Sequence, residues 1–249
     1  MNAMIIRADG LAKHFGKKHV LNGVAFDLPS GGIHGLLGRN GVGKSTLLQI
    51  VAGQLKSSGG AVEVFGLAPF DNAEVMDRVA LTGVDVGYPA SWSGKDILKG
   101  AQLRYPNWDD GLARRLIDDF DLGEALGTTY SKMSRGQRAM VGNIIGIASG
   151  AELTLLDEPY VGLDVHNTNV FYRHLLDVAE GGRTFVMATH HIEEASKILS
   201  SALVLGRDGK VSAHVTADDA DAHAERLDLS NPLRPVDFGD VIEHLLEVS

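Results

Sequence analysis

The sequence predicts an α/β protein with a mostly parallel sheet flanked by helices. Short apolar runs typical of buried strands, at residues 32–37, 153–156 and 184–188, alternate with segments of helical periodicity. Residues 4–30 alternate weakly and are broken by glycine and proline, which indicates an antiparallel β region at the N-terminus. Between about residues 84 and 133 the pattern is helical, a further helix is predicted at 139–149, and together they would occupy about residues 84–149. We therefore expect a helical subdomain inserted into the α/β chain.

Composition narrows the possible classes of protein. The 249 residues are 44% hydrophobic and 22% charged, which is ordinary for a globular chain. The formal net charge of −9 argues against a generally basic face, so no nucleic-acid partner is expected. The absence of cysteine excludes disulfides, thiolate zinc sites and cysteine nucleophiles. With no signal peptide and no apolar run near the ~18 residues that span a bilayer, a cytoplasmic chain is expected.

The segment from Gly38 to Thr46 carries the strongest chemical signal. It matches the phosphate-binding pattern G-x-x-x-x-G-K-[ST], in which glycines let backbone N–H groups point at phosphate oxygens. Lys44 would supply a positive charge for the β- and γ-phosphates, and Ser45 a hydroxyl for Mg²⁺. An apolar strand precedes the segment and a helix follows it, as the pattern requires. The alternative is a glycine-rich turn. The residues predicted to bind phosphate are Gly38, Arg39, Asn40, Gly41, Val42, Gly43, Lys44, Ser45 and Thr46.

Two later strands end in residues suited to phosphate chemistry. Asp157 and Glu158 follow the strand at 153–156, where ligands bind in an α/β sheet. Side chains alternate along a strand, so one carboxylate can hold Mg²⁺ while the other meets an attacking water. The alternative is a surface turn before a proline. His190 follows the strand at 184–188 and could reach a γ-phosphate. The competing interpretation of His190 as part of a zinc site fits no known ligand spacing.

Ser134 and Gln137 form a capping-box pattern before a helix predicted at residues 139–149. Taken alone, these residues indicate an ordinary helix start, which is also an anion-binding position.

Several aromatic residues allow two interpretations. Phe15 lies upstream of the glycine loop and could stack on an adenine ring, or be a core residue at a strand end. Tyr88, Trp92, Tyr105 and Trp108 fall within the helical segment. They could form a docking surface, or they could pack the small helical core.

In this order along the chain, the phosphate loop, Ser134-Arg135-Gly136-Gln137, Asp157-Glu158, Gly162-Leu163-Asp164 and His190 resemble the ATP-binding-cassette (ABC) ATPases. The resemblance covers about residues 4–215 and implies a P-loop NTPase core. Tyr105-Pro106-Asn107-Trp108-Asp109 is similar to a subgroup that works with export-type permeases.

The resemblance implies a role for each matching residue. Residues 38–46 would hold the phosphates of ATP, and Phe15 would stack on adenine. Asp157 would support Mg²⁺ beside Ser45, Glu158 would be the general base, and His190 would contact the γ-phosphate. The family acts as a dimer in which the signature residues of one subunit close over ATP held by the other. These signature residues are Ser134, Arg135, Gly136 and Gln137, and Asp164 would lie near the dimer seam.

The sequence departs from the family pattern in three places. Met133 and Arg135 replace the leucine and the first glycine of the usual signature Leu-Ser-Gly-Gly-Gln, and Tyr160 follows the Glu-Pro pair. The family also has a glutamine on the loop that enters the helical subdomain, where this chain has Val84 and Asp85. Asp85 could replace that glutamine as a water-mediated Mg²⁺ contact.

From this resemblance we expect an ATP-hydrolysing subunit that dimerises on ATP and drives a separate membrane permease, as an exporter. The dimer could be a homodimer or a heterodimer. The chain would lie in the cytoplasm at the inner face of the membrane, bound through the permease. Residues 1–215 would form the ATPase domain and 216–249 a C-terminal extension, weakly structured over 216–235 and helical over 236–247. The alternative is a soluble ABC-type ATPase acting in assembly or regulation without a permease.

Overall fold

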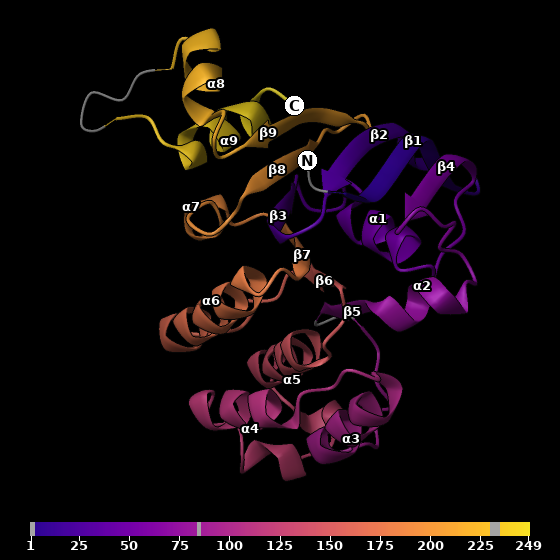
Figure 1. The fold of residues 1–249 in the computed structure, drawn as a ribbon, viewed down its shortest axis with the longest axis vertical. Helices are drawn as coiled ribbons and strands as arrows, with labels where there is room; N and C mark the ends of the chain where they lie inside the picture. Colours follow the sequence, from indigo (N-terminus) through magenta and orange to yellow (C-terminus); the bar gives the residue numbers. More distant parts are fainter. Residues whose placement is uncertain (1–2, 84–85, 230–234) are drawn as a thin grey trace.

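The computed structural model describes residues 3–83, 86–229 and 235–249. In these residues a central six-stranded sheet has the order β5-β6-β7-β3-β8-β9, with β9 antiparallel and the other strands parallel (Figure 1). The predicted mostly parallel sheet is therefore present. Its strands are β3 (Gly32–Leu37), β5 (Val79–Gly83), β6 (Leu153–Asp157), β7 (Thr184–Thr189), β8 (Ser201–Leu205) and β9 (Val211–Thr216).

The N-terminal β region is a second, antiparallel sheet with the order β2-β1-β4. This confirms the antiparallel strands expected in residues 4–30. Leu11, Leu21 and Val24 are fully buried there and share an apolar core with α1, the helix that follows the glycine loop. The second sheet therefore packs against the helix that follows the phosphate loop and so helps to hold the loop in place. The bounds are β1 (Met4–Phe15), β2 (Lys18–Pro29), α1 (Lys44–Val51), β4 (Gly59–Val64) and α2 (Ala73–Arg78).

The described chain between β5 and β6 folds into helices joined by loops, and most of it extends to one end of the molecule (Figure 1). Its last helix, α5, packs both on α4 and on the sheet strands β5 and β6. α5 begins at Arg135, earlier than the predicted start at Ala139, because Ser134 caps it. The elements are α3 (Gly94–Arg104), α4 (Asp110–Asp119), η1 (Ala125–Gly127), η2 (Tyr130–Lys132) and α5 (Arg135–Ala148).

The aromatic residues of this helical segment mainly pack its core. Tyr88, Tyr105 and Trp108 are partly buried against the apolar cluster, and Tyr88 meets the Tyr130 ring edge-on at 5.4 Å. Trp92 remains 43% exposed. The prediction of a shared docking surface is therefore wrong for three of the four aromatic residues.

Arg183 anchors the C-terminal end of α5. Its guanidinium donates to the carbonyl oxygens of Gly146 and Ile147, at the end of the helix, and to that of Ala151 beyond it. Burial lowers the pKa of Arg183 to about 10, so the side chain is still charged near neutral pH. A positive charge at this end also complements the helix dipole.

The C-terminal residues pack back onto the last strands of the central sheet, at the end of the molecule opposite the helical segment (Figure 1). The expectation of weak structure over 216–235 is wrong in part, because residues 220–226 form a helix. That short, charged stretch has little apolar periodicity and becomes helical where it packs on α9 and β9. The remaining helices are α6 (Val165–Glu180), α7 (Ile192–Ala195), α8 (Ala220–Arg226) and α9 (Phe238–Glu247).

His34 is a polar residue in the middle of the buried strand β3. Its ring nitrogens lie 2.8 Å from the Ser201 hydroxyl and 2.9 Å from the Gly31 carbonyl oxygen. The side chain is 2% exposed, and this burial lowers its pKa from 6.5 to about 4, although the bond to Gly31 opposes the shift. The folded protein therefore keeps His34 neutral.

We expect His34 to make stability pH-dependent between pH 6.5 and about 4. In that window the unfolded chain binds a proton at His34 and the folded protein does not, so the free energy of unfolding falls as pH falls. Over the whole window the change corresponds to about 3 kcal/mol. His34→Gln should remove this part of the pH dependence in urea unfolding curves measured across the window. Equal slopes in the variant and the wild type would contradict the assignment.

Candidate functional site

The phosphate loop connects β3 to α1. Gly38, Gly41 and Gly43 all have positive φ angles, of 157°, 79° and 121°. At Gly38 a Cβ would also lie 2.8 Å from the carbonyl oxygen of Leu205, so the loop needs glycine for space as well as for conformation. The loop conformation matches the one that the sequence pattern predicts.

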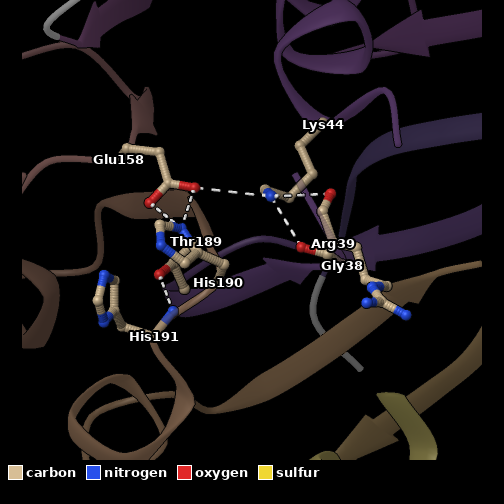
Figure 2. A network of polar contacts seen from close by, with 7 residues as sticks. All are labelled: Gly38, Arg39, Lys44, Glu158, Thr189, His190 and His191. Carbon is tan, nitrogen blue, oxygen red and sulfur yellow. Dashed lines mark hydrogen bonds and ion pairs between the residues drawn. The ribbon is translucent and has the colours of Figure 1, made fainter. Parts of the chain in front are cut away.

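Lys44, the first residue of α1, points back across the loop. Its Nζ donates to the carbonyl oxygen of Gly38 at 2.8 Å and lies 3.6 Å from Oε1 of Glu158 (Figure 2). The side chain of Lys44 is only 6% exposed. A buried ammonium needs such partners, because unpaired burial of a charge is costly.

Glu158 lies between Lys44 and His190. Nδ1 of His190 is 2.9 Å from Oε1 and 3.0 Å from Oε2 of the carboxylate, so the ring donates this hydrogen bond (Figure 2). The turn that carries His190 is fixed by the His191 amide, which donates to the Thr189 hydroxyl at 2.8 Å. The structure thus brings together three residues that the sequence analysis assigned to one site.

Strand order explains this convergence. β7 lies between β6 and β3, and its register pairs Thr189 with Leu37 and Ala188 with Asp157. The carboxyl ends of the three parallel strands therefore meet at one edge of the sheet, the usual ligand position in such folds. Asp157, the last residue of β6, is half-buried at this edge.

A cavity of about 640 Å³ opens over the phosphate loop. Phe15 lines it and is 51% exposed, so its interpretation as a core residue is wrong. Lys18 and Val20, which sequence reasoning missed, also line the cavity. Their position at the start of β2, just after Phe15, is the signal that could have found them. The remaining lining residues are Asn40, Gly41, Gly43, Lys44, Ser45, Thr46, Arg135, Glu158, Val161 and His190.

The predicted signature residues lie at the start of α5. Ser134 and Gln137 form the capping box: the Ser134 hydroxyl accepts from the Gln137 amide at 3.1 Å, and the Ser134 amide donates to the Gln137 side chain at 2.9 Å. Arg135 is exposed and lines the cavity over the phosphate loop of its own chain. Ser134, Gly136 and Gln137 do not line that cavity. Within one chain, the structure thus brings Arg135 alone of the four to the phosphate loop.

Gly136 makes the tightest contact of this helix start. A Cβ at this position would lie 2.3 Å from the carbonyl oxygen of Gly162. Gly162 itself has a φ angle of +84°, in the loop between β6 and α6. The signature helix and this loop are therefore in backbone contact, which only glycine permits.

Asp164 caps α6. Its carboxylate accepts from the Asn167 amide at 2.8 Å, and the residue lines a second cavity of about 550 Å³ beside the first. Arg135 and His190 line both cavities. Tyr160, one of the departures from the family pattern, is a mostly buried residue that lines this second cavity, with its ring 5.4 Å from that of His191 and edge-on to it.

The donor set suits a small hard cation. Ser45 offers a hydroxyl and Asp157 a carboxylate, the oxygen ligands that Mg²⁺ prefers. Within the described part of the chain no group of three His, Cys, Asp or Glu side chains could hold a metal. His190 and His191 therefore belong to no such group there. Mg²⁺ is commonly held by one or two protein oxygens together with substrate phosphates. The predicted contact from Asp85 lies outside the described residues, as does Val84.

A glycine loop between a strand and a helix, facing an acidic strand end in a parallel sheet, defines the fold as that of a P-loop NTPase. Comparison with known proteins agrees. A model of the ABC transporter family matches residues 21–161. A solved structure of an ATP-binding subunit of an ABC transporter superimposes with a TM-score of 0.81, at 22% identity, over 97% of this chain and 99% of that one.

Curated relatives carry the same family name. An uncharacterised ABC transporter ATP-binding protein of Methanocaldococcus jannaschii is 30% identical over 207 residues, which cover 80% of this chain and 73% of the relative. The daunorubicin resistance ATP-binding protein DrrA2 of Streptomyces coeruleorubidus is 29% identical over 230 residues, covering 88% and 69%. This chain belongs to the ABC transporter family, as an ATP-binding subunit. Among the described residues, no helix combines the length and the apolar character needed to cross a bilayer.

The contact between Gly136 and Gly162 can be tested by stability. Gly136→Ala places a methyl group against the Gly162 carbonyl and should lower the free energy of unfolding by about 1–3 kcal/mol in urea. Gly142→Ala is the matched control on the same buried helix, because its Cβ would meet neighbours only at 3.7 Å or beyond. That control should be neutral or stabilising by up to about 1 kcal/mol. Similar effects of the two variants would contradict the contact.

Proposed function

We propose that this chain hydrolyses ATP and thereby drives a separate membrane permease, working as a dimer at the cytoplasmic face of the membrane. The observation that carries the proposal is the position of Glu158. Its carboxylate lies in the cavity of the phosphate loop, 3.6 Å from Nζ of Lys44 and 2.9 Å from Nδ1 of His190. A base, a cation and a hydrogen-bond donor thus converge where a γ-phosphate would lie.

Binding of ATP would use the loop as it stands. The backbone N–H groups of residues 38–46 and the N-terminus of α1 would face the phosphates, and Phe15 would stack on the adenine ring. Lys44 would exchange its bond to the Gly38 carbonyl for bonds to phosphate oxygens. When bound beside Ser45 and Asp157, Mg²⁺ would neutralise charge on the β- and γ-phosphates. Asp85 is a further candidate contact to that ion.

Hydrolysis requires an oriented water. Glu158 would accept a proton from this water as the water oxygen forms its bond to the γ-phosphorus. The bond from the γ-phosphorus to the β–γ bridging oxygen breaks, and its electron pair leaves with ADP. The products are ADP and inorganic phosphate. His190 would hold the Glu158 carboxylate and contact the γ-phosphate, while Lys44 stabilises the charge that spreads over the phosphate oxygens.

The second half of the site would come from a partner subunit, identical or different. Ser134, Gly136 and Gln137 lie outside the cavity of their own chain, which fits a role at the nucleotide of the partner. Arg135 would add a positive charge beside the nucleotide of the partner. Asp164 would lie at the seam between the subunits. The helix N-terminus that Ser134 caps is suited to an anion.

Export is supported by two observations. Tyr105–Asp109 resembles the export-type subgroup, and the name of the Streptomyces coeruleorubidus relative refers to daunorubicin resistance.

We propose a single ATPase domain over residues 1–215, with the helical subdomain at about 84–149 and a C-terminal extension at 216–249.

Glu158→Gln tests the reaction. The amide cannot act as a base, so kcat for ATP hydrolysis should fall by about 10²–10⁴-fold. Binding of ATP should persist, and the variant should accumulate as an ATP-bound dimer in size-exclusion chromatography. Turnover at the wild-type rate would remove Glu158 from the mechanism.

Lys44→Ala tests nucleotide binding separately. The variant loses the buried ammonium and should bind ATP at least about tenfold more weakly, measured by calorimetry. Leu103→Ala serves as a control, because that side chain is 79% exposed on α3 and does not line the cavity. Equal affinity of Lys44→Ala and wild type would contradict the assigned phosphate site.

The permease is tested by co-purification. The chain should be recovered with an integral membrane protein from detergent-solubilised membranes of its source cells, and that partner should stimulate ATP hydrolysis. Recovery only as a free dimer, with full activity in the absence of membrane protein, would contradict coupling to a permease.

A further inference from the structure

The backbone at Glu158 adopts a demanding conformation. Its φ angle is +51°, in the left-handed region that residues with a Cβ seldom occupy. The next residue is Pro159, and a residue before proline is restricted further, toward extended conformations. A backbone of this kind persists only where the surrounding structure holds it. The contacts that hold Glu158 therefore matter for the direction of its carboxylate.

Three hydrogen bonds fix the turn that begins at Glu158. The Glu158 amide donates to the Ala188 carbonyl of β7 at 3.0 Å, and the Val161 amide donates to the Glu158 carbonyl at 3.2 Å. The third bond comes from a side chain: Nδ2 of Asn143 donates to the Pro159 carbonyl at 2.8 Å. This bond is fully within the protein, because Asn143 is 2% exposed and Pro159 is buried.

Asn143 lies on α5, the helix whose first turn carries the predicted signature residues. A buried amide is usually retained for its hydrogen bonds, since burying it without them costs stability. Here one of those bonds reaches the residue next to Glu158. The same helix touches the same loop a second time, where Gly136 meets the Gly162 carbonyl. α5 and residues 158–162 are thus joined at two separate points.

We propose that Asn143 is a positioning residue for ATP hydrolysis, and that it couples α5 to the Glu158 carboxylate of the same chain. By fixing the Pro159 carbonyl, Asn143 holds Glu158 in its left-handed conformation and so directs the carboxylate into the cavity. Any shift of α5, including one made when its first turn meets the nucleotide of a partner, is then passed to Glu158. This inference rests on the proposed function, because it needs Glu158 to act on ATP.

The test uses Asn143→Leu, which keeps the branched shape and the number of side-chain heavy atoms but removes the donor, and the smaller Asn143→Ala as a second variant. Both should lower kcat for ATP by about 10–100-fold, since small displacements of a reacting group have effects of this size. KM for ATP should change less than about threefold, because Asn143 does not line the phosphate cavity. Ser149→Ala is the matched control: it removes a buried hydroxyl that bonds to the Gly146 carbonyl, the Ala151 amide and Arg183 at the other end of α5, and it should leave kcat unchanged.

A double-variant cycle separates positioning from general destabilisation. In the Glu158→Gln background, Asn143→Leu should cause no further loss of turnover, because the group it positions is already inactive. The ATP-bound dimer of Glu158→Gln should form equally well with and without Asn143→Leu, whereas a deformed signature helix would weaken it.

The proposal is overturned if both Asn143 variants fold, bind ATP and turn over at the wild-type rate. It is also overturned if Ser149→Ala lowers kcat as much as they do, or if their losses appear in KM instead of kcat. Additive losses in the double variant would likewise exclude a route through Glu158. A wild-type chain that hydrolyses no ATP, alone or with its permease, would contradict the proposed function itself and this inference with it.

Discussion

The ion pair between Lys44 and Glu158 joins the two parts of the chain on which the site depends. Lys44 begins the helix after β3, and Glu158 follows β6, with β7 between these strands in the sheet. The Lys44 ammonium and the Glu158 carboxylate lie 3.6 Å apart across that intervening strand. His190, which follows β7, donates a hydrogen bond to the same carboxylate. A nearly buried ammonium requires such partners. The strand order, the glycine loop and the turn at Pro159 are therefore constrained together, since a change in any of them would separate the charges.

Much of this arrangement could be predicted because it is encoded locally. The glycine loop requires backbone conformations and close approaches that only glycine allows, and those residues are visible in the sequence. The polar ends of buried strands are equally visible, and parallel strands place such ends at one edge of a sheet. The antiparallel N-terminal strands follow from alternation and from glycine and proline at the turns. α5 begins directly after Ser134, the first residue of its capping box, and four residues before the start that the apolar pattern indicates.

The remaining features depend on contacts between distant segments. The placement of β7 between β6 and β3 has no local signal. α8 was missed because a short polar stretch is stabilised mainly by packing against α9 and β9. Phe15 could not be assigned to the surface or the core from its neighbours, and the same holds for Trp92. Asn143 gave no signal at all: one amide in an apolar helix becomes meaningful only when the Pro159 carbonyl is seen beside it. Arg135 lines the cavity of its own chain because two segments far apart in the sequence converge in space.

Arg183 holds the C-terminal end of α5 in place, and the first turn of the helix lies at the other end. The guanidinium fixes the C-terminal end of the helix, whereas Ser134 stands at the opposite end, about 20 Å away at 1.5 Å per residue. Asn143 stands only about 7 Å from the fixed end on the same scale. If the helix pivots as a rigid rod, displacement at Asn143 is about one third of that at Ser134. A displacement of the exposed first turn would then reach Asn143 as a smaller displacement inside the protein.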